Sequence, residues 1–145
     1  MADFVSYYFT SAEGENLFYP PAKEDQIMLL ESQLGIRLPD DYKDFLRVTN
    51  GFAGFVNEFY VDFDSVEKVC QSTQQTCAEF FPGMIYIGTD GGLEMFVIDT
   101  RKTPFQFGLL PYIGSFEDFI PLGDTFEKFV SRLYDDTVFD IIISL

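Results

Sequence analysis

The chain has 145 residues, enough for one domain over residues 1–145 whose core needs no metal or disulfide support. Apolar residues make up 47% of the sequence and aromatic residues 18%, which excludes an intrinsically disordered protein. The 24 acidic and 9 basic residues give a formal charge of −15, and such a surface repels nucleic-acid phosphates. We therefore expect no direct nucleic-acid binding, and an acidity that either attracts a basic partner or serves solubility.

The residue types also exclude several kinds of chemistry. Without histidine there is no Ser-His-Asp or Cys-His arrangement, and no nucleotide-binding glycine motif occurs. Cys70 and Cys77 on one helix would lie about 10 Å apart, too far for a disulfide, and two thiols alone cannot close a zinc site. We expect reduced cysteines, no metal and no cofactor. No apolar run reaches membrane-spanning length and Met1 opens no secretory leader, so we expect a cytoplasmic protein with no membrane partner.

Two short amphipathic helices are predicted in the first third, after an aromatic extension over residues 1–19 that we expect to pack on the domain. The first helix should span residues 23–34 and end at Gly35, which suits a left-handed C-terminal position. The second should open with Pro39 at its first helical position and stop at Asn50-Gly51. Its buried stripe is expected to be Tyr42, Phe45 and Leu46, with Lys43, Asp44 and Arg47 facing water.

A sheet should follow. Alternating residues predict a strand over residues 59–63, and Asp64 with Glu67 predicts the start of a third helix that ends at residues 81–83. Residues 84–88 and 93–99 flank an Asp-Gly-Gly turn typical of a hairpin, and residues 105–110 continue it as a meander. We further expect a short strand near residues 116–120, a last helix capped by Asp124 or Thr125, and an apolar tail over residues 136–145 that pairs as an edge strand or packs as a clasp.

The predicted fold class is α+β, with the N-terminal helical pair and the C-terminal helix packed on a mainly antiparallel sheet of about four to six strands. The segment from Glu24 to Gly51 resembles the N-terminal signature of the SUKH superfamily, which includes Smi/Knr-type fungal regulators of cell-wall glucan synthesis. Ile87–Asp99 is similar to its central glycine-rich hairpin, and Thr125–Val130 resembles its final helix. The signature residues that we expect to be structural are Glu31, Gly35, Leu38, Pro39, Tyr42, Phe45, Asn50, Gly51, Phe126 and Phe129.

The resemblance implies a noncatalytic domain, often an immunity protein that neutralises a secreted toxin whose nuclease surface is basic. The alternative is an adaptor that regulates glucan or cell-wall synthesis. A carboxylate-dependent hydrolase is the lesser alternative, and a homo-oligomer stays open. The aromatic extension and the apolar tail lie outside the resemblance, so nothing about a partner is carried over to them.

Five carboxylates are the candidate partner-binding residues: Asp62, Asp64, Asp90, Glu94 and Asp99. Their grouping around the hairpin also fits a hydrolytic pair, a cation site or merely solvated charge. The calcium-loop pattern is absent, and a turn explains Asp90-Gly-Gly, so an acidic rim for a partner is preferred to catalysis. Glu31 is either exposed or buried with a partner, for which Arg37 and Tyr42 are the candidates.

Overall fold

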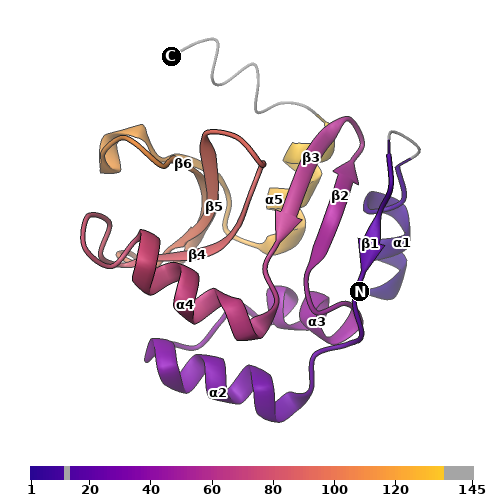
Figure 1. Cartoon of the computed structure of the whole chain (residues 1–145), viewed down its shortest axis with the longest axis horizontal. Helices are drawn as coiled ribbons and strands as arrows, with labels where there is room; N and C mark the ends of the chain where they lie inside the picture. The colour runs from indigo at the N-terminus through magenta and orange to yellow at the C-terminus, as the bar shows by residue number, and fades with distance from the viewer. Residues whose placement is uncertain (12–13, 136–145) are drawn as a thin grey trace.

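The computed structural model describes residues 1–11 and 14–135, which form helices around a seven-stranded antiparallel sheet. The strands pair in chain order, so every strand lies beside its neighbours in sequence (Figure 1). Their bounds are β1 Leu17–Phe18, β2 Phe52–Val56, β3 Phe59–Phe63, β4 Met84–Thr89, β5 Glu94–Asp99, β6 Gln106–Pro111 and β7 Ile120–Gly123.

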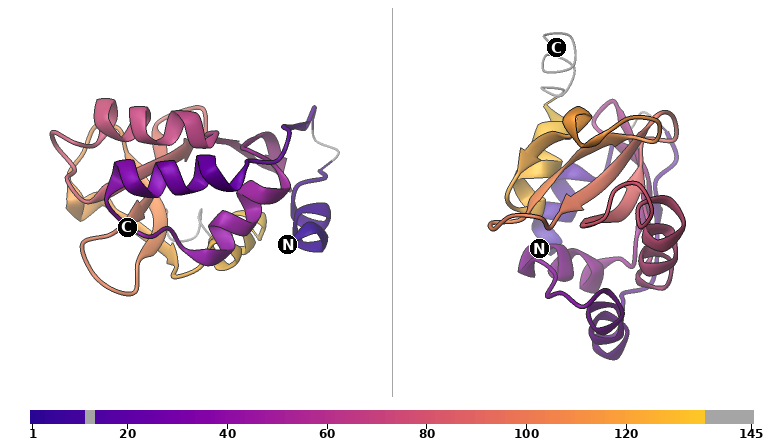
Figure 2. Two further views of the ribbon diagram at one scale, coloured as in Figure 1. Left: turned by 90° about the horizontal axis from the view of Figure 1, so that it is seen from below. Right: turned by 90° about the vertical axis from the view of Figure 1, so that its left-hand side faces the viewer.

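Helices cover the sheet in two groups. Helices α1, α3 and α5 pack together, whereas α2 lies alongside α4 at another side of the molecule (Figures 1 and 2). Their bounds are α1 Ala2–Tyr8, α2 Glu24–Leu34, α3 Asp40–Val48, α4 Val66–Thr76 and α5 Phe126–Tyr134, with a short 3-10 helix η1 at Phe116–Asp118. The α+β prediction is confirmed, with more strands than the four to six expected.

Alternation along the strands separates two apolar cores. Phe96 and Ile98 of β5 point into the larger core, which Phe45, Phe126 and other helical side chains fill. The intervening β5 residues, Met95 and Val97, point into a smaller core on the opposite face. Both faces of β5 are therefore buried, which explains its nearly continuous apolar sequence.

The N-terminal segment packs on the domain, as expected, but residues 2–8 form a helix and residues 17–18 an edge strand that were not predicted. Phe9 is fully buried, with its ring centroid 4.8 Å from that of Phe52. The Tyr8 hydroxyl lies 3.0 Å from Ser131 Oγ of α5. This segment therefore contributes to the larger core.

Several predicted boundaries are wrong. Pro39 is the N-cap of α3 rather than its first helical residue, and α4 ends with Cys77 as its C-cap rather than at residues 81–83. Residues 116–118 form η1, and the strand predicted near residues 116–120 begins only at Ile120. The Asp-Gly-Gly hairpin and the Thr125 cap are confirmed, because β4 pairs with β5 and Thr125 Oγ1 accepts the Lys128 amide.

The predicted apolar tail lies outside the described residues, which end at Asp135. None of the helices within residues 1–11 and 14–135 combines the length and the apolar character that crossing a bilayer requires.

Candidate functional site

Asp99 is separated from the other candidate carboxylates because it ends β5, whereas Glu94 begins that strand. Both carboxylate oxygens of Asp99 accept hydrogen bonds from the Arg101 guanidinium, at 2.9 Å each. Hydrogen bonding and charge from Arg101 lower the pKa of Asp99. Arg101 also lies 4.0 Å above the Phe116 ring, so this pair fixes the local structure and is neutralised.

Asp62 and Asp64 lie at the end of β3, where they line a hollow of about 260 Å³ with Tyr19, Asn50 and Lys68. Asp64 does not cap α4 as predicted: Ser65 is the N-cap residue, and the Val66 amide donates to Asn50 Oδ1 at 2.8 Å. Asp64 instead accepts a hydrogen bond from Ser72 Oγ at 2.8 Å.

The Asp64 carboxyl is half-buried, and burial raises its pKa. The Ser72 hydrogen bond opposes this shift, Asp62 adds to it, and Lys68 opposes it. Burial is the largest of these causes, so ionisation of Asp64 is disfavoured in the folded protein.

Asp90 and Glu94 lie on either side of the β4–β5 turn. Asp90 Oδ1 accepts the Gly92 amide at 2.8 Å and the Glu94 amide at 3.2 Å, so this oxygen is committed to the turn. Glu94 Oε2 is buried and has no hydrogen-bond partner within the described part of the chain. Burial raises the pKa of Glu94, and the charges of Asp90 and Asp118 raise it further.

The register of β3 and β4 places Asp62 and Asp64 near Asp90 and Glu94. Asp62 pairs across the sheet with Thr89, the residue immediately before Asp90. We call Asp62, Asp64, Asp90, Glu94 and Asp118 the acidic surface; among the described residues, none of the five takes part in an ion pair. Asp118 was missed in the sequence because only the fold of the segment after β6 places its charge near Glu94.

Metal and thiol chemistry have little support at this surface. Within residues 1–11 and 14–135, no cluster of three or more histidine, cysteine or acidic side chains is suited to hold a metal ion. Both cysteines are free thiols, as expected, although Cys70 is only partly buried. Burial raises the pKa of Cys77 to about 11, so its reactive thiolate is scarce at neutral pH.

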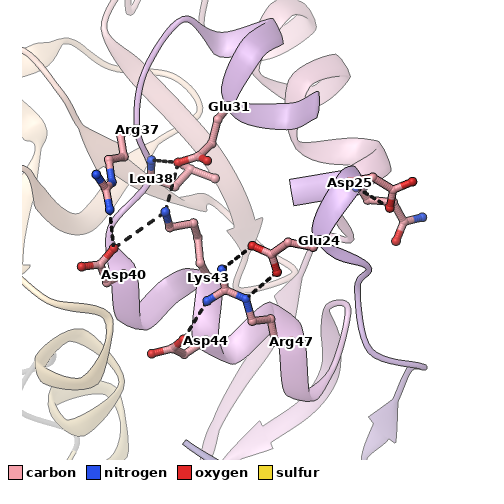
Figure 3. A network of polar contacts seen from close by, with 10 residues as sticks. Glu24, Asp25, Glu31, Arg37, Leu38, Asp40, Lys43, Asp44 and Arg47 are labelled. Carbon is pink, nitrogen blue, oxygen red and sulfur yellow. Dashed lines mark hydrogen bonds and ion pairs between the residues drawn. The ribbon is translucent and has the colours of Figure 1, made fainter. Parts of the chain in front are cut away.

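The signature residue Glu31 belongs to a polar network between α2 and α3 (Figure 3). Glu31 Oε2 accepts the Leu38 amide at 2.7 Å and lies 3.3 Å from Lys43 Nζ. Lys43 is only 7% exposed, so the prediction that it faces water is wrong. Neither predicted partner is correct, because Arg37 pairs with Asp40 on the surface and the buried Tyr42 hydroxyl has no partner among the described atoms.

The other signature residues lie at helix ends and in the larger core. Gly35 is the left-handed C-cap of α2, and Gly51 has a φ of 99° with no room for a side chain, since an added Cβ would lie 2.7 Å from the Phe63 carbonyl oxygen. Asp41 of the same signature accepts the first two amides of α5, at 3.1 and 2.9 Å, and so caps a helix 85 residues away. The remaining core members, Leu38, Tyr42, Phe45, Phe126 and Phe129, are buried.

Known proteins are similar to this chain over most of its length. A family model described as SMI1 / KNR4 family (SUKH-1) matches residues 21–132. The chain is also 32% identical over 133 residues to "Uncharacterized protein YnaB" of Bacillus subtilis (strain 168), over 88% of this chain and 81% of that protein. The family match spans helices α2 and α3, the β4–β5 hairpin and the acidic surface, and it begins after α1 and β1.

Proposed function

Because the chain belongs to the SMI1 / KNR4 family (SUKH-1), we propose that it is a noncatalytic protein-binding domain of the immunity type, which neutralises a basic toxin by binding it directly. One observation carries this proposal: within the described residues, none of the five carboxylates of the acidic surface takes part in an ion pair, whereas Glu24, Asp99 and Asp124 each pair with a basic side chain. Arg47 pairs with Glu24 and Asp44, and Arg101 pairs with Asp99. The five carboxylates of the acidic surface therefore keep charge that would attract a basic partner.

The arrangement gives less support to a carboxylate hydrolase. A hydrolytic pair needs one carboxylate free to act as base or nucleophile and another free to act as acid. Asp90 instead accepts two amides of its own turn, and the Cys77 thiol is buried. A role in direct binding requires no such freedom, and fixed carboxylates favour it because less side-chain entropy is lost on association.

Co-expression with the product of the adjacent gene tests the function. We expect a complex that survives purification, and rescue of cells from the toxicity of the neighbouring protein. The absence of both a complex and rescue would contradict the proposal. Recovery of cell-wall synthesis enzymes in place of one small basic protein would favour the regulatory role instead.

The rate of association provides a second test. If the acidic surface steers a basic partner, the association rate constant should fall steeply between low salt and physiological salt, where the Debye length is about 8 Å. Stopped-flow mixing at several salt concentrations measures this dependence. A rate constant that does not change with salt would indicate an apolar interface and contradict electrostatic steering.

A further inference from the structure

The end of the sheet beside the β4–β5 turn carries an open cleft of about 490 Å³. Its lining comes from two adjacent segments, Gly92–Glu94 at the start of β5 and Pro111–Ile113 at the end of β6. The segments are joined where the Tyr112 amide donates to the Leu93 carbonyl at 3.0 Å. This volume is within the range of pockets that bind small ligands.

The rim of the cleft is unusually apolar for a surface. Leu93 is 81% exposed and Ile113 is 94% exposed, and Tyr112 lies between them with 38% exposed. The Tyr112 hydroxyl is held 2.8 Å from the Tyr86 hydroxyl, so the rim is attached to a buried side chain of the sheet. Adjacent exposed apolar side chains of this size mark an interaction site, because water contact with them is unfavourable.

An acidic side chain lines the cleft. Glu94 lines it, with Oε2 buried and unpartnered within the described residues, and Asp90 and Asp118 lie close enough to act on its ionisation. A buried carboxylate oxygen without a donor is unfavourable, and an entering cation with N–H donors would supply both the charge and the hydrogen bond.

We propose that this cleft binds an arginine or lysine side chain of a partner protein, with apolar neighbours of that residue packed on Leu93 and Ile113. The cation pairs with Glu94, and the apolar side chains around the cleft exclude water from the pair. The inference rests on the proposed binding function and deepens it, because it selects one part of the acidic surface as the contact that recognises the partner. Apolar contact around a desolvated ion pair is the usual anatomy of an interface centre.

A peptide titration tests the cleft without the natural partner. The probe is the acetylated, amidated peptide Leu-Phe-Arg-Leu, and its comparison is the same peptide with citrulline, which keeps the shape of arginine but has no charge. Amide NMR spectra of the labelled protein should show saturable shifts at Leu93, Glu94 and Ile113 with the arginine peptide. The citrulline peptide should bind roughly fivefold to tenfold more weakly, as expected when one hydrogen bond keeps its N–H donor but loses its charge.

Variants separate the two parts of the contact. Glu94→Gln should weaken the arginine peptide roughly fivefold to tenfold and remove the preference over citrulline. The double variant Leu93→Ser and Ile113→Ser should weaken both peptides equally. Glu79→Gln and Met28→Ser are matched controls at exposed positions outside the cleft, and we expect unchanged binding. The dispersion of each NMR spectrum reports whether the variant is folded.

Three results would overturn the inference: no shifts at the cleft, equal binding of both peptides, or an effect of Glu79→Gln as large as that of Glu94→Gln. The last result would mean that only overall charge matters. Failure of the proposed function is a separate outcome, namely no complex with the adjacent gene product. If that complex forms but Glu94→Gln and the double serine variant bind it like the parent protein, only the cleft inference fails.

Discussion

Replacement of Glu31 by alanine should destabilise the protein strongly, because one carboxylate oxygen serves two partners. It accepts the Leu38 amide at 2.7 Å and faces the ammonium of Lys43, whose side chain is only 9% exposed. A hydrogen bond to a charged acceptor contributes about 1.5–3 kcal/mol. Breaking a fully buried ion pair costs about 3–5 kcal/mol, and the remaining contact with Asp40, at 3.7 Å, places this site at the lower end of that range.

We therefore expect Glu31→Ala to lower the free energy of unfolding by about 3 kcal/mol, equivalent to a fall of roughly 6–12 °C in Tm for a chain of this size. Glu31→Gln keeps an acceptor for the Leu38 amide and should lower the free energy of unfolding by about half as much as Glu31→Ala. Lys43→Met keeps the apolar stem of the side chain and should cost about 1 kcal/mol or less.

Urea denaturation followed by circular dichroism measures these values, since an uncharged denaturant does not screen the ion pair. The double variant Glu31→Ala with Lys43→Met should be less destabilised than the sum of the single variants, by about 1–2 kcal/mol. Glu79→Ala, at an exposed position, is the control and should stay within about 0.5 kcal/mol of the parent. A Glu31→Ala effect below about 1 kcal/mol, or strict additivity, would refute the reasoning.

Gly51→Ala should destabilise more than Gly35→Ala: both positions have positive φ, which costs an L-residue about 1–2 kcal/mol, but only at Gly51 would the new Cβ collide with backbone, the Phe63 carbonyl. Tyr42→Phe should raise the free energy of unfolding by roughly 1–2 kcal/mol, because it removes a buried hydroxyl that lacks a partner in the described structure. Asp64→Asn should stabilise the protein at pH 7, and this gain should disappear as the pH falls through the ordinary pKa of an aspartate. The folded pKa of Asp64 is raised above its unfolded value, so the ionised carboxylate disfavours folding at pH values above the unfolded pKa.

Urea titrations provide the readout for all three. Equal effects at the two glycines would show that the backbone near Phe63 moves aside. Destabilisation by Tyr42→Phe would indicate that the hydroxyl has a hydrogen bond in solution. For Asp64→Asn, whose amide oxygen can still accept from Ser72, a gain that is independent of pH would exclude ionisation as its cause.

Local signals predicted the parts of the fold whose causes are local. The stripe of Ile27 and Leu30 and the glycine at position 35 determine α2, and the Asp-Gly-Gly turn determines the β4–β5 hairpin. Strand β2 was missed because Phe52–Val56 contains Gly54 and follows a helix stop directly, so its alternation is short. Helix α1 was also missed, because its aromatic residues indicate packing on the domain but do not distinguish a helix from another backbone conformation.

Tertiary pairing accounts for the errors at the candidate site. Lys43 occupies a helical position that periodicity assigns to solvent, but Glu31 on another helix supplies its counter-ion. Asp64 has the right residue type for a cap, but Asn50 from a distant turn bonds to the first amide of α4. Asp99 and Glu94 are close in sequence, yet the length of β5 separates them and Arg101 neutralises only Asp99.

The strictly sequential order of the sheet has a consequence for how the chain folds. Each strand pairs with the strand before it, and the hairpins β2–β3, β4–β5 and β5–β6 join segments of short sequence separation, which favours fast folding. The contact between Tyr8 and Ser131, by contrast, joins residues 123 positions apart. We expect the hairpins to form early and the docking of α1 against α5 to come last, so that deuterium exchange in the native protein opens this seam before it opens the centre of the sheet.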